Sequence, residues 1–423
     1  MQKQPTTLAI DTSCDETSAS VVEGVRVLSN IQPSQMEYHK KYGGVVPSLA
    51  KLAHTERIDN VVTEALKQAQ KTIDDVDYIS VTYGPGLAIA LEVGINKAKE
   101  LAKEFNKPIM IINHMEGHLL SSFAERNSML EVNGHGRSVQ CVEVANKCPS
   151  IGVLISGGHT EFVLVKQIGE YEKIGETLDD SCGECLDKCG RMLGLGYPAG
   201  PIISEFSKKQ RKKVKIEKVK DNQSTLLRLS SGTESYELPI PMANSNDLNM
   251  SYSGLKTAFK QLVDKIAEDK KVKKVKDGKL EANIETFDLE KEEIMNLCVL
   301  LEATAYEQIA IKLKNALRKY SVKEVWLGGG VVASSRLRSV VRSTVKSFDE
   351  SIEVRYPYSK KLTTDNAAMI GVAANINMLQ LQKLQISLSP ENKATLGEHG
   401  IFIDSSDFSE IDRDPSLELP VYV

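Results

Sequence analysis

The sequence has few aromatic residues, no long apolar run and almost no net charge. Aromatic side chains make up 5% of its 423 residues, and glycine and proline, at 28 and 14, are not in excess. With 26% charged and 41% hydrophobic residues, a fibrous or disordered chain is excluded. No stretch reaches the roughly 18 apolar residues that a membrane span needs, and Met1–Thr7 lacks the apolar stretch of a secretory signal. We therefore expect a cytoplasmic globular protein with no membrane partner.

Cysteine is scarce as well, and the seven cysteines are an odd number. Three of them, Cys182, Cys185 and Cys189, lie close together in the sequence. This pattern predicts reduced thiols rather than disulfides. The spacing suits a zinc site, but it equally suits small side chains that pack against a neighbouring helix. No second cysteine pair or histidine is close by, so both interpretations stay open.

Positive charge is unevenly distributed, although 53 basic residues nearly balance 57 acidic ones and leave a formal charge of −4. Lys208–Lys220 holds eight basic residues and one acidic residue, and Lys270–Lys279 holds six and one. We predict two solvated, partly mobile Lys-rich insertions, near 207–237 and 268–290.

Two similar strand–turn–strand patterns predict a duplicated α/β fold. Leu8–Ile10 and Ala19–Val22 flank one polar turn, and Ile151–Ile155 and Phe162–Val165 flank another. Periodic helical stretches follow each hairpin. We place the boundary between the two halves within 127–149, where small and polar residues accumulate. The predicted units are an N-terminal lobe at 5–135, a C-terminal lobe at 149–380 and a surface tail at 385–423.

Two histidines follow an apolar strand and are separated by one helical turn. His114 and His118 would therefore share one face of a helix, where both imidazoles could bind one metal ion. A third ligand is needed, and Asp365 is the best candidate, because it lies between a strand-like run and a helix of small residues. The glutamate in this motif does not follow the first histidine directly, so the zinc-peptidase pattern is absent. The alternative is a capped helix end with satisfied histidines.

Four glycine-bearing turns follow apolar strands or helices. Glycine allows backbone N–H groups to approach an anion closely, and a following helix adds a favourable field. Single turns of this kind are usually structural, but four together predict a nucleotide or phosphate cleft. The four turns are Gly84–Leu87, Ser156–Thr160, Gly194–Gly200 and Gly328–Val332.

A third motif opens a predicted helix with carboxylates at Asp179 and Asp180 and continues to Asp187. Asp187 lies two helical turns further on, where it could meet a ribose hydroxyl. The first two carboxylates could instead oppose the helix dipole at the N-terminus.

Eight segments, in one order, resemble the TsaD family of tRNA threonylcarbamoyladenosine transferases. The resemblance spans about residues 8 to 375, and it is specific because many short motifs agree. The segments are Asp11–Thr17, Tyr42–Ala50, Gly84–Leu87, His114–His118, Ser156–Thr160, Leu193–Pro201, Ser251–Thr257 and Thr364–Ile370.

The resemblance implies an actin, Hsp70 and hexokinase type of fold, with two ribonuclease-H-like lobes around a nucleotide cleft. It also implies the reaction, which is transfer of the threonylcarbamoyl group from threonylcarbamoyl-adenylate to the exocyclic amine of the adenosine beside the tRNA anticodon, with release of AMP. By motif match, His114, His118 and Asp365 would hold one divalent metal ion, iron in preference to zinc.

The same match assigns the remaining site residues. Asp15 and Glu16 would lie at the reacting centre, where a carboxylate could accept the amine proton. Serine stands at 334, where the family has an asparagine that touches the nucleotide, and cysteines replace the family's small residues in the acidic helix. The residues expected to line the adenylate site are Leu154, Ile155, Ser156, Gly157, Gly158, Asp187, Gly200 and Ser334.

Partners follow from the resemblance alone. Bacterial-type relatives act with a degenerate TsaB-like paralogue, a small TsaE-like ATPase and an upstream synthase, whereas mitochondrial-type relatives act as homodimers. The Lys-rich insertions could contact tRNA phosphates or could be solvated loops. Alternatives to the transferase are an ATPase of the same fold and a non-catalytic scaffold paralogue, which would be expected to lack the two histidines and the aspartate.

Overall fold

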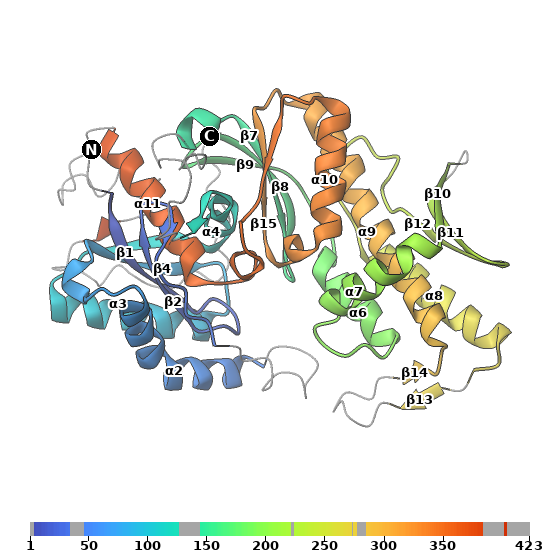
Figure 1. Cartoon of the computed structure of the whole chain (residues 1–423), viewed down its shortest axis with the longest axis horizontal. Helices are drawn as coiled ribbons and strands as arrows, with labels where there is room; N and C mark the ends of the chain where they lie inside the picture. The colour runs from blue at the N-terminus through green and yellow to red at the C-terminus, as the bar shows by residue number, and fades with distance from the viewer. Residues whose placement is uncertain are drawn as a thin grey trace.

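The computed structural model describes residues 4–33, 46–126, 144–220, 224–272, 274–276, 285–383 and 402–403. Most of the predicted linker, most of the predicted tail and the start of the Tyr42–Ala50 segment lie outside these residues. Within them, two mixed β-sheets stand next to each other with helices packed around them (Figure 1).

The first sheet has the strand order β17-β5-β4-β1-β2-β3-β6 in the described part of the chain. β1 pairs antiparallel with β2 and parallel with β4, while β2–β3 is antiparallel and β4–β5 is parallel. The central strands are buried on both faces, which explains their continuous apolar runs. The strands are β1 (Thr6–Asp11), β2 (Ser18–Glu23), β3 (Arg26–Val27), β4 (Tyr78–Gly84), β5 (Ile109–Asn113), β6 (Glu125–Arg126) and β17 (Phe402–Ile403).

The second sheet repeats this arrangement with the order β16-β15-β7-β8-β9. β7 pairs antiparallel with β8 and parallel with β15, as β1 pairs with β2 and β4. The shared order confirms the predicted α/β class and the two ribonuclease-H-like lobes. The strands are β7 (Ser150–Ile155), β8 (Thr160–Gln167), β9 (Glu170–Glu176), β15 (Glu324–Gly328) and β16 (Glu353–Arg355).

Helices cover both sheets, and the longest, α9, crosses the second core. α9 is long and apolar enough to span a membrane, but 72% of its most apolar window is buried inside the molecule, as in a core helix. The α-helices are α2 (Pro47–Gln68), α3 (Ala88–Phe105), α4 (His114–Leu120), α6 (Cys182–Met192), α7 (Gly200–Gln210), α8 (Ser253–Asp269), α9 (Lys291–Lys319), α10 (Ser335–Phe348) and α11 (Ala367–Lys383). Short 3-10 helices are η1 (Ile73–Asp75), η2 (Ser121–Phe123), η3 (Ala145–Lys147), η4 (Arg211–Lys213), η5 (Gly330–Ala333) and η6 (Lys360–Leu362).

The sequence suggested that the first Lys-rich insertion is a solvated loop, and the structure corrects this prediction. The insertion folds into a three-stranded antiparallel sheet, with β11 in the middle, that packs on α8 and α9. Leu227 and Leu229 alternate with polar residues and are buried, so one face of this sheet joins the core. The strands are β10 (Lys215–Lys220), β11 (Thr225–Ser231) and β12 (Glu234–Pro239). In the second insertion, β13 (Lys274–Lys276) pairs with β14 (Glu285–Phe287).

One helix of each half contacts the sheet of the other half. In each half a helix follows the fifth strand of the repeat, α4 after β5 and α11 after β16. α4 packs against β7 and β15 of the second sheet, whereas α11 packs against β1 and β2 of the first sheet and against α4 (Figure 1). The predicted C-terminal lobe at 149–380 includes α11, which therefore connects the second half with the first sheet.

Candidate functional site

The first part of the site is the N-terminus of α4. β5 ends at Asn113, whose side-chain oxygen accepts hydrogen bonds from the backbone N–H groups of Met115 at 2.8 Å and Glu116 at 3.2 Å. This cap starts the helix at His114. His114 and His118 are buried one turn apart, with ring centroids separated by 4.6 Å.

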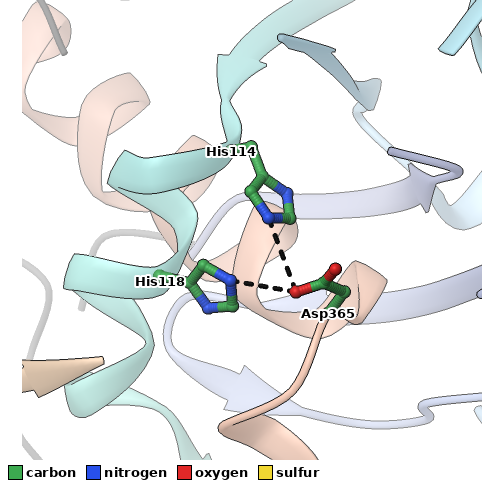
Figure 2. Close-up of side chains that lie close together, drawn as sticks. All are labelled: His114, His118 and Asp365. Carbon is green, nitrogen blue, oxygen red and sulfur yellow. Dashed lines mark hydrogen bonds and ion pairs between the residues drawn. The ribbon is translucent and has the colours of Figure 1, made fainter. Parts of the chain in front are cut away.

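Asp365 reaches this pair from the segment that precedes α11. Its Oδ1 lies 3.0 Å from Nε2 of His118 and 3.5 Å from Nε2 of His114 (Figure 2). One donor atom from each residue lies within 4.8 Å of the others, the only such His, Cys, Asp and Glu group found in the described part of the chain. Burial alone would raise the pKa of Asp365, but the two histidines outweigh it and hold that pKa well below its usual range.

The donor set fits a divalent transition-metal ion, because two imidazoles and one carboxylate suit iron or zinc and leave coordination positions open. Both Nδ1 atoms are buried without a hydrogen-bond partner, and Nδ1 of His114 lies 3.9 Å from Oδ1 of the buried Asp11. A carboxylate only accepts, so Nε2 of His118 donates to Oδ1 of Asp365 in the structure. A bound ion would take the place of that proton, and the ring proton would then lie on Nδ1.

A polar loop between β1 and β2 carries the predicted catalytic carboxylates, and His54 on α2 holds this loop. Nε2 of His54 lies 3.1 Å from the carbonyl oxygen of Cys14, and Nδ1 lies 2.8 Å from the hydroxyl of Thr17. A carbonyl only accepts, so Nε2 carries the proton and Nδ1 accepts from Thr17. Burial lowers the pKa of His54, which favours this neutral form.

Glu16, on the same loop, is linked to the metal-ligand segment by Gln32. Nε2 of Gln32 donates to Oε2 of Glu16 at 3.0 Å and to the carbonyl oxygen of Asp365 at 2.7 Å. Burial raises the pKa of Glu16 to about 7; the hydrogen bond from Gln32 opposes this shift, and Asp15 and Asp365 add to it. Glu16 thus changes protonation state near neutral pH.

The first glycine turn supports this loop instead of presenting free N–H groups. The backbone N–H of Leu87 donates to the carbonyl oxygen of Ser13 at 2.7 Å. A Cβ atom at Gly86 would lie 2.5 Å from that same oxygen, so only glycine allows the approach. This turn is therefore structural.

The turn between β7 and β8 leaves open space beside its glycines. Leu154 and Ile155 are buried strand residues. The Ser156 hydroxyl accepts from the backbone N–H of Gly158 at 3.3 Å, and no atom lies within 4 Å of a Cβ built at Gly157 or Gly158. A ligand can therefore approach this backbone.

His159, which ends this turn, connects it with the metal ligands. Burial lowers the pKa of His159 to about 4, and His114 and His118 add to the shift. The glycine turn and the histidine pair therefore belong to one region.

Asp187 caps the next helix. Its Oδ1 accepts from the backbone N–H groups of Ala199 at 2.8 Å and Gly200 at 3.1 Å, at the N-terminus of α7. The space beside Gly200 is open. Asp179 and Asp180 instead bind the start of α8, through Tyr252 N at 2.7 Å and Lys256 Nζ at 2.6 Å. They are structural carboxylates, although they form hydrogen bonds with the start of α8 and not, as the sequence suggested, with the N-terminus of their own helix.

Ser334 caps α10, and its hydroxyl accepts from Leu337 N at 3.4 Å. It also contacts Ser204 at 3.1 Å and the buried Glu302 at 3.4 Å. The hydroxyl thus belongs to a polar cluster between α7, α9 and α10.

The cysteines pack in the core. Cys182, Cys185 and Cys189 are fully buried, and Sγ atoms of the last two lie 4.0 Å apart. Among the described residues they join no metal-ligand group. The structure favours the packing interpretation.

The structure therefore brings three predicted metal ligands together and links Glu16 to them. Sequence reasoning missed Gln32, His54 and Asp11. Asp11 ends the apolar run Leu8–Ile10, a usable signal, whereas nothing in the sequence singles out His54 or Gln32.

Comparison with known proteins finds one family. A family model described as TsaD, tRNA N6-adenosine threonylcarbamoyltransferase, matches residues 26–372. A protein of that name from Clostridioides difficile is 36% identical over 384 residues, which cover 90% of this chain and 96% of the relative. One from Fusobacterium nucleatum is 38% identical over 369 residues, covering 87% and 89%.

Solved structures show more distant similarity. Full-length HypF with bound phosphate and nucleotide aligns over 90% of this chain and 47% of its own, with a TM-score of 0.47 and 13% identity. The ROK hexokinase from Thermus thermophilus aligns over 89% and 99%, with a TM-score of 0.38 and 12% identity.

Proposed function

The chain belongs to the TsaD family of tRNA N6-adenosine threonylcarbamoyltransferases, so it is a tRNA-modifying transferase, and we propose how its own residues perform the transfer. The donor is threonylcarbamoyl-adenylate, and the acceptor is the exocyclic amine of the adenosine beside the anticodon. The amine attacks the carbamoyl carbon, the bond to the phosphate oxygen breaks, and AMP leaves. Such an activated donor needs mainly orientation and charge stabilisation.

His114, His118 and Asp365 hold the metal ion in this proposal, with iron preferred to zinc. The convergence of their three donor atoms is the observation that carries the proposal. A bound divalent ion supplies Lewis-acid stabilisation of negative charge on a substrate oxygen.

Glu16 accepts the proton that the amine loses as it attacks. Its raised pKa, about 7, makes it a stronger base than an exposed carboxylate while it still ionises at neutral pH. Asp15 precedes it on the same loop, and we assign it to the reacting centre as well. Gln32 holds Glu16 beside the metal-ligand segment.

The adenylate lies along the open turn at Gly157 and Gly158 and the N-terminus of α7 at Gly200. The open glycine backbone of this turn allows a phosphate to approach closely, whereas the N–H groups of Ala199 and Gly200 already donate to Asp187. Asp187 fixes the N-terminus of α7 and contributes to the ribose site. We also assign Ser334 to the adenylate site, at the N-terminus of α10, where its hydroxyl has protein partners of its own. The end of β7 and the start of the following turn form the wall of this site, through Leu154, Ile155 and Ser156.

We further propose that the protein acts in the cytoplasm, either with a TsaB-like paralogue and a TsaE-like ATPase or as a homodimer. A scaffold paralogue is not favoured, because the two histidines and the aspartate are all present and converge. Phosphoryl transfer has no need of the histidine pair, which disfavours an ATPase.

The test incubates the purified chain with anticodon-stem tRNA and threonylcarbamoyl-adenylate, with and without candidate partners, and measures the mass of the modified nucleoside. We expect the added threonylcarbamoyl mass, and its loss together with bound metal in His118→Ala. A wild-type protein that holds metal but adds no mass under any partner combination would refute the assignment.

A further inference from the structure

Basic side chains form a stripe on α10. The helix carries four basic residues and no acidic residue. Arg338, Arg342 and Lys346 follow one another at intervals of four and therefore lie on one face. Arg342 and Lys346 are exposed. α10 packs against α9 in the second half (Figure 1).

Tyr356, just after β16, holds two of these arginines. The guanidinium carbon of Arg338 lies 5.1 Å from the Tyr356 ring centre, and that of Arg342 lies 5.5 Å away. Arg342 also donates to the Tyr356 hydroxyl at 3.0 Å. A guanidinium stacked on an aromatic ring is oriented in advance and keeps N–H groups at its edge for a phosphate.

Between Tyr356 and Asp365 the chain carries a second arginine–tyrosine contact and two more basic residues. Tyr358 is 40% exposed, and Arg126 lies 5.5 Å from its ring centre. Lys360 and Lys361 follow and are exposed. Lys361 precedes Asp365 by four residues, so their Cα atoms are at most about 14 Å apart. We call Arg126, Arg338, Arg342, Tyr356, Tyr358, Lys360 and Lys361 the Arg–Tyr surface.

In the described part of the chain, the cations of this surface have no ion-pair partner, whereas four of the eight basic residues in Lys208–Lys220 have one. In the insertion sheet, basic residues on its strands pair with glutamates. These pairs are Lys215–Glu217, Lys218–Glu307 and Arg228–Glu237.

We propose that the Arg–Tyr surface binds the anticodon arm of the tRNA substrate. The stacked arginines and the two lysines contact backbone phosphates, and the exposed Tyr358 ring stacks on an unpaired base of the loop. This places RNA beside Asp365, where the acceptor adenosine must enter. The inference rests on the proposed function and locates its macromolecular substrate away from the Lys-rich insertion.

A binding experiment tests the surface directly. The probe is a fluorescent anticodon stem-loop RNA with an adenosine beside the anticodon, titrated with the full-length protein over a series of salt concentrations. For the double variant Arg338→Gln and Arg342→Gln we expect about tenfold weaker binding and a salt slope smaller by about one to two. Tyr358→Ala should weaken binding with little change in salt slope.

The matched control is the double variant Lys215→Gln and Lys218→Gln, which removes the same charge from the insertion. It should change affinity less than twofold. The proposal would be overturned if the arginine variant bound RNA as tightly as the wild type, or if the control variant lost as much affinity. It would also be overturned if the arginine variant kept its RNA affinity but no longer bound an acidic partner protein.

Transfer kinetics separate this inference from the proposed function. In the arginine variant the KM for tRNA should rise while the metal content stays at the wild-type value. If the wild type bound RNA through this surface but transferred nothing, the proposed function would fail and the surface would stand.

Discussion

The side-chain nitrogen of Gln32 lies 2.7 Å from the carbonyl oxygen of Asp365, and the same nitrogen donates to Glu16. One amide thus connects the predicted base with the segment that carries the proposed metal ligand Asp365. Both partners can only accept a hydrogen bond while Glu16 is ionised, so the orientation of the amide is determined.

Gln32→Met should keep the side-chain length and remove this connection. A hydrogen bond to a charged group contributes about 1.5–3 kcal/mol, so kcat/KM should fall about tenfold or more. Steady-state transfer assays and metal analysis check this, with metal content unchanged. The control is Gln68→Met, an exposed position on α2. An equal decrease in both variants would show that Gln32 has no special role.

The pH dependence of transfer should report Glu16. Because burial raises its pKa to about 7, the carboxylate is protonated in acid, and kcat/KM should rise with pH and level off above about 7. Glu16→Gln should lower the rate strongly and flatten this rise. A wild-type profile that is flat between pH 5 and 8 would rule out Glu16 as the base.

The stability of wild type and Glu16→Gln should diverge with pH in a defined sense. A carboxyl group whose folded pKa lies above its unfolded pKa of ~4.3 stabilises the fold in acid, and this contribution is lost as pH rises through about 7. Urea unfolding at pH 5 and pH 8 should therefore show the wild type losing more stability than the variant between these two values. The opposite order would indicate a lowered pKa.

His54→Ala should loosen the loop that carries Asp15 and Glu16. The change removes two buried hydrogen bonds and leaves a cavity, so the free energy of unfolding should decrease by about 2–4 kcal/mol. Residual folded enzyme should show reduced kcat with metal still bound. On the same helix, exposed Lys67→Ala should cost about 0.5 kcal/mol or less.

Gly371→Ala should disturb the packing of α11 on the first sheet. A Cβ atom there would lie 2.6 Å from Val22 and 3.2 Å from Ala9, so the helix must shift, at a cost of about 1–3 kcal/mol. Metal affinity should decrease because Asp365 directly precedes this helix. At Gly254 the nearest atom is 4.0 Å away, so Gly254→Ala should be neutral or stabilising. Thermal unfolding and metal titration compare the two variants.

Much of the fold was predictable because its signals are local. The paired hairpins at Leu8–Val22 and Ile151–Val165 show alternating strand and turn chemistry, and the α/β duplication follows from them. The prediction of a loop for the Lys-rich insertion was wrong because the many lysines hide the alternation of apolar and polar residues that marks a strand. Leu227, Leu229 and Leu238 form one buried face, but they are divided between two strands, so neither strand shows a long pattern.

The site was predictable where residue type and spacing specify geometry, as for His114 and His118. Asp365 does lie beside the two histidines, as predicted, although its position depends on α11 packing across to the first half, which no local pattern shows. Gln32 could not have been found, because an amide on a surface segment has no spacing or pattern that marks its tertiary partners.

The packing of α4 on α11 has a consequence for the two halves taken separately. α4 carries the two histidines and α11 follows Asp365, and because these helices pack on each other the three side chains meet between the halves. The two histidines come from the first half of the chain and Asp365 comes from the second, so neither half produced alone would bring the three side chains together.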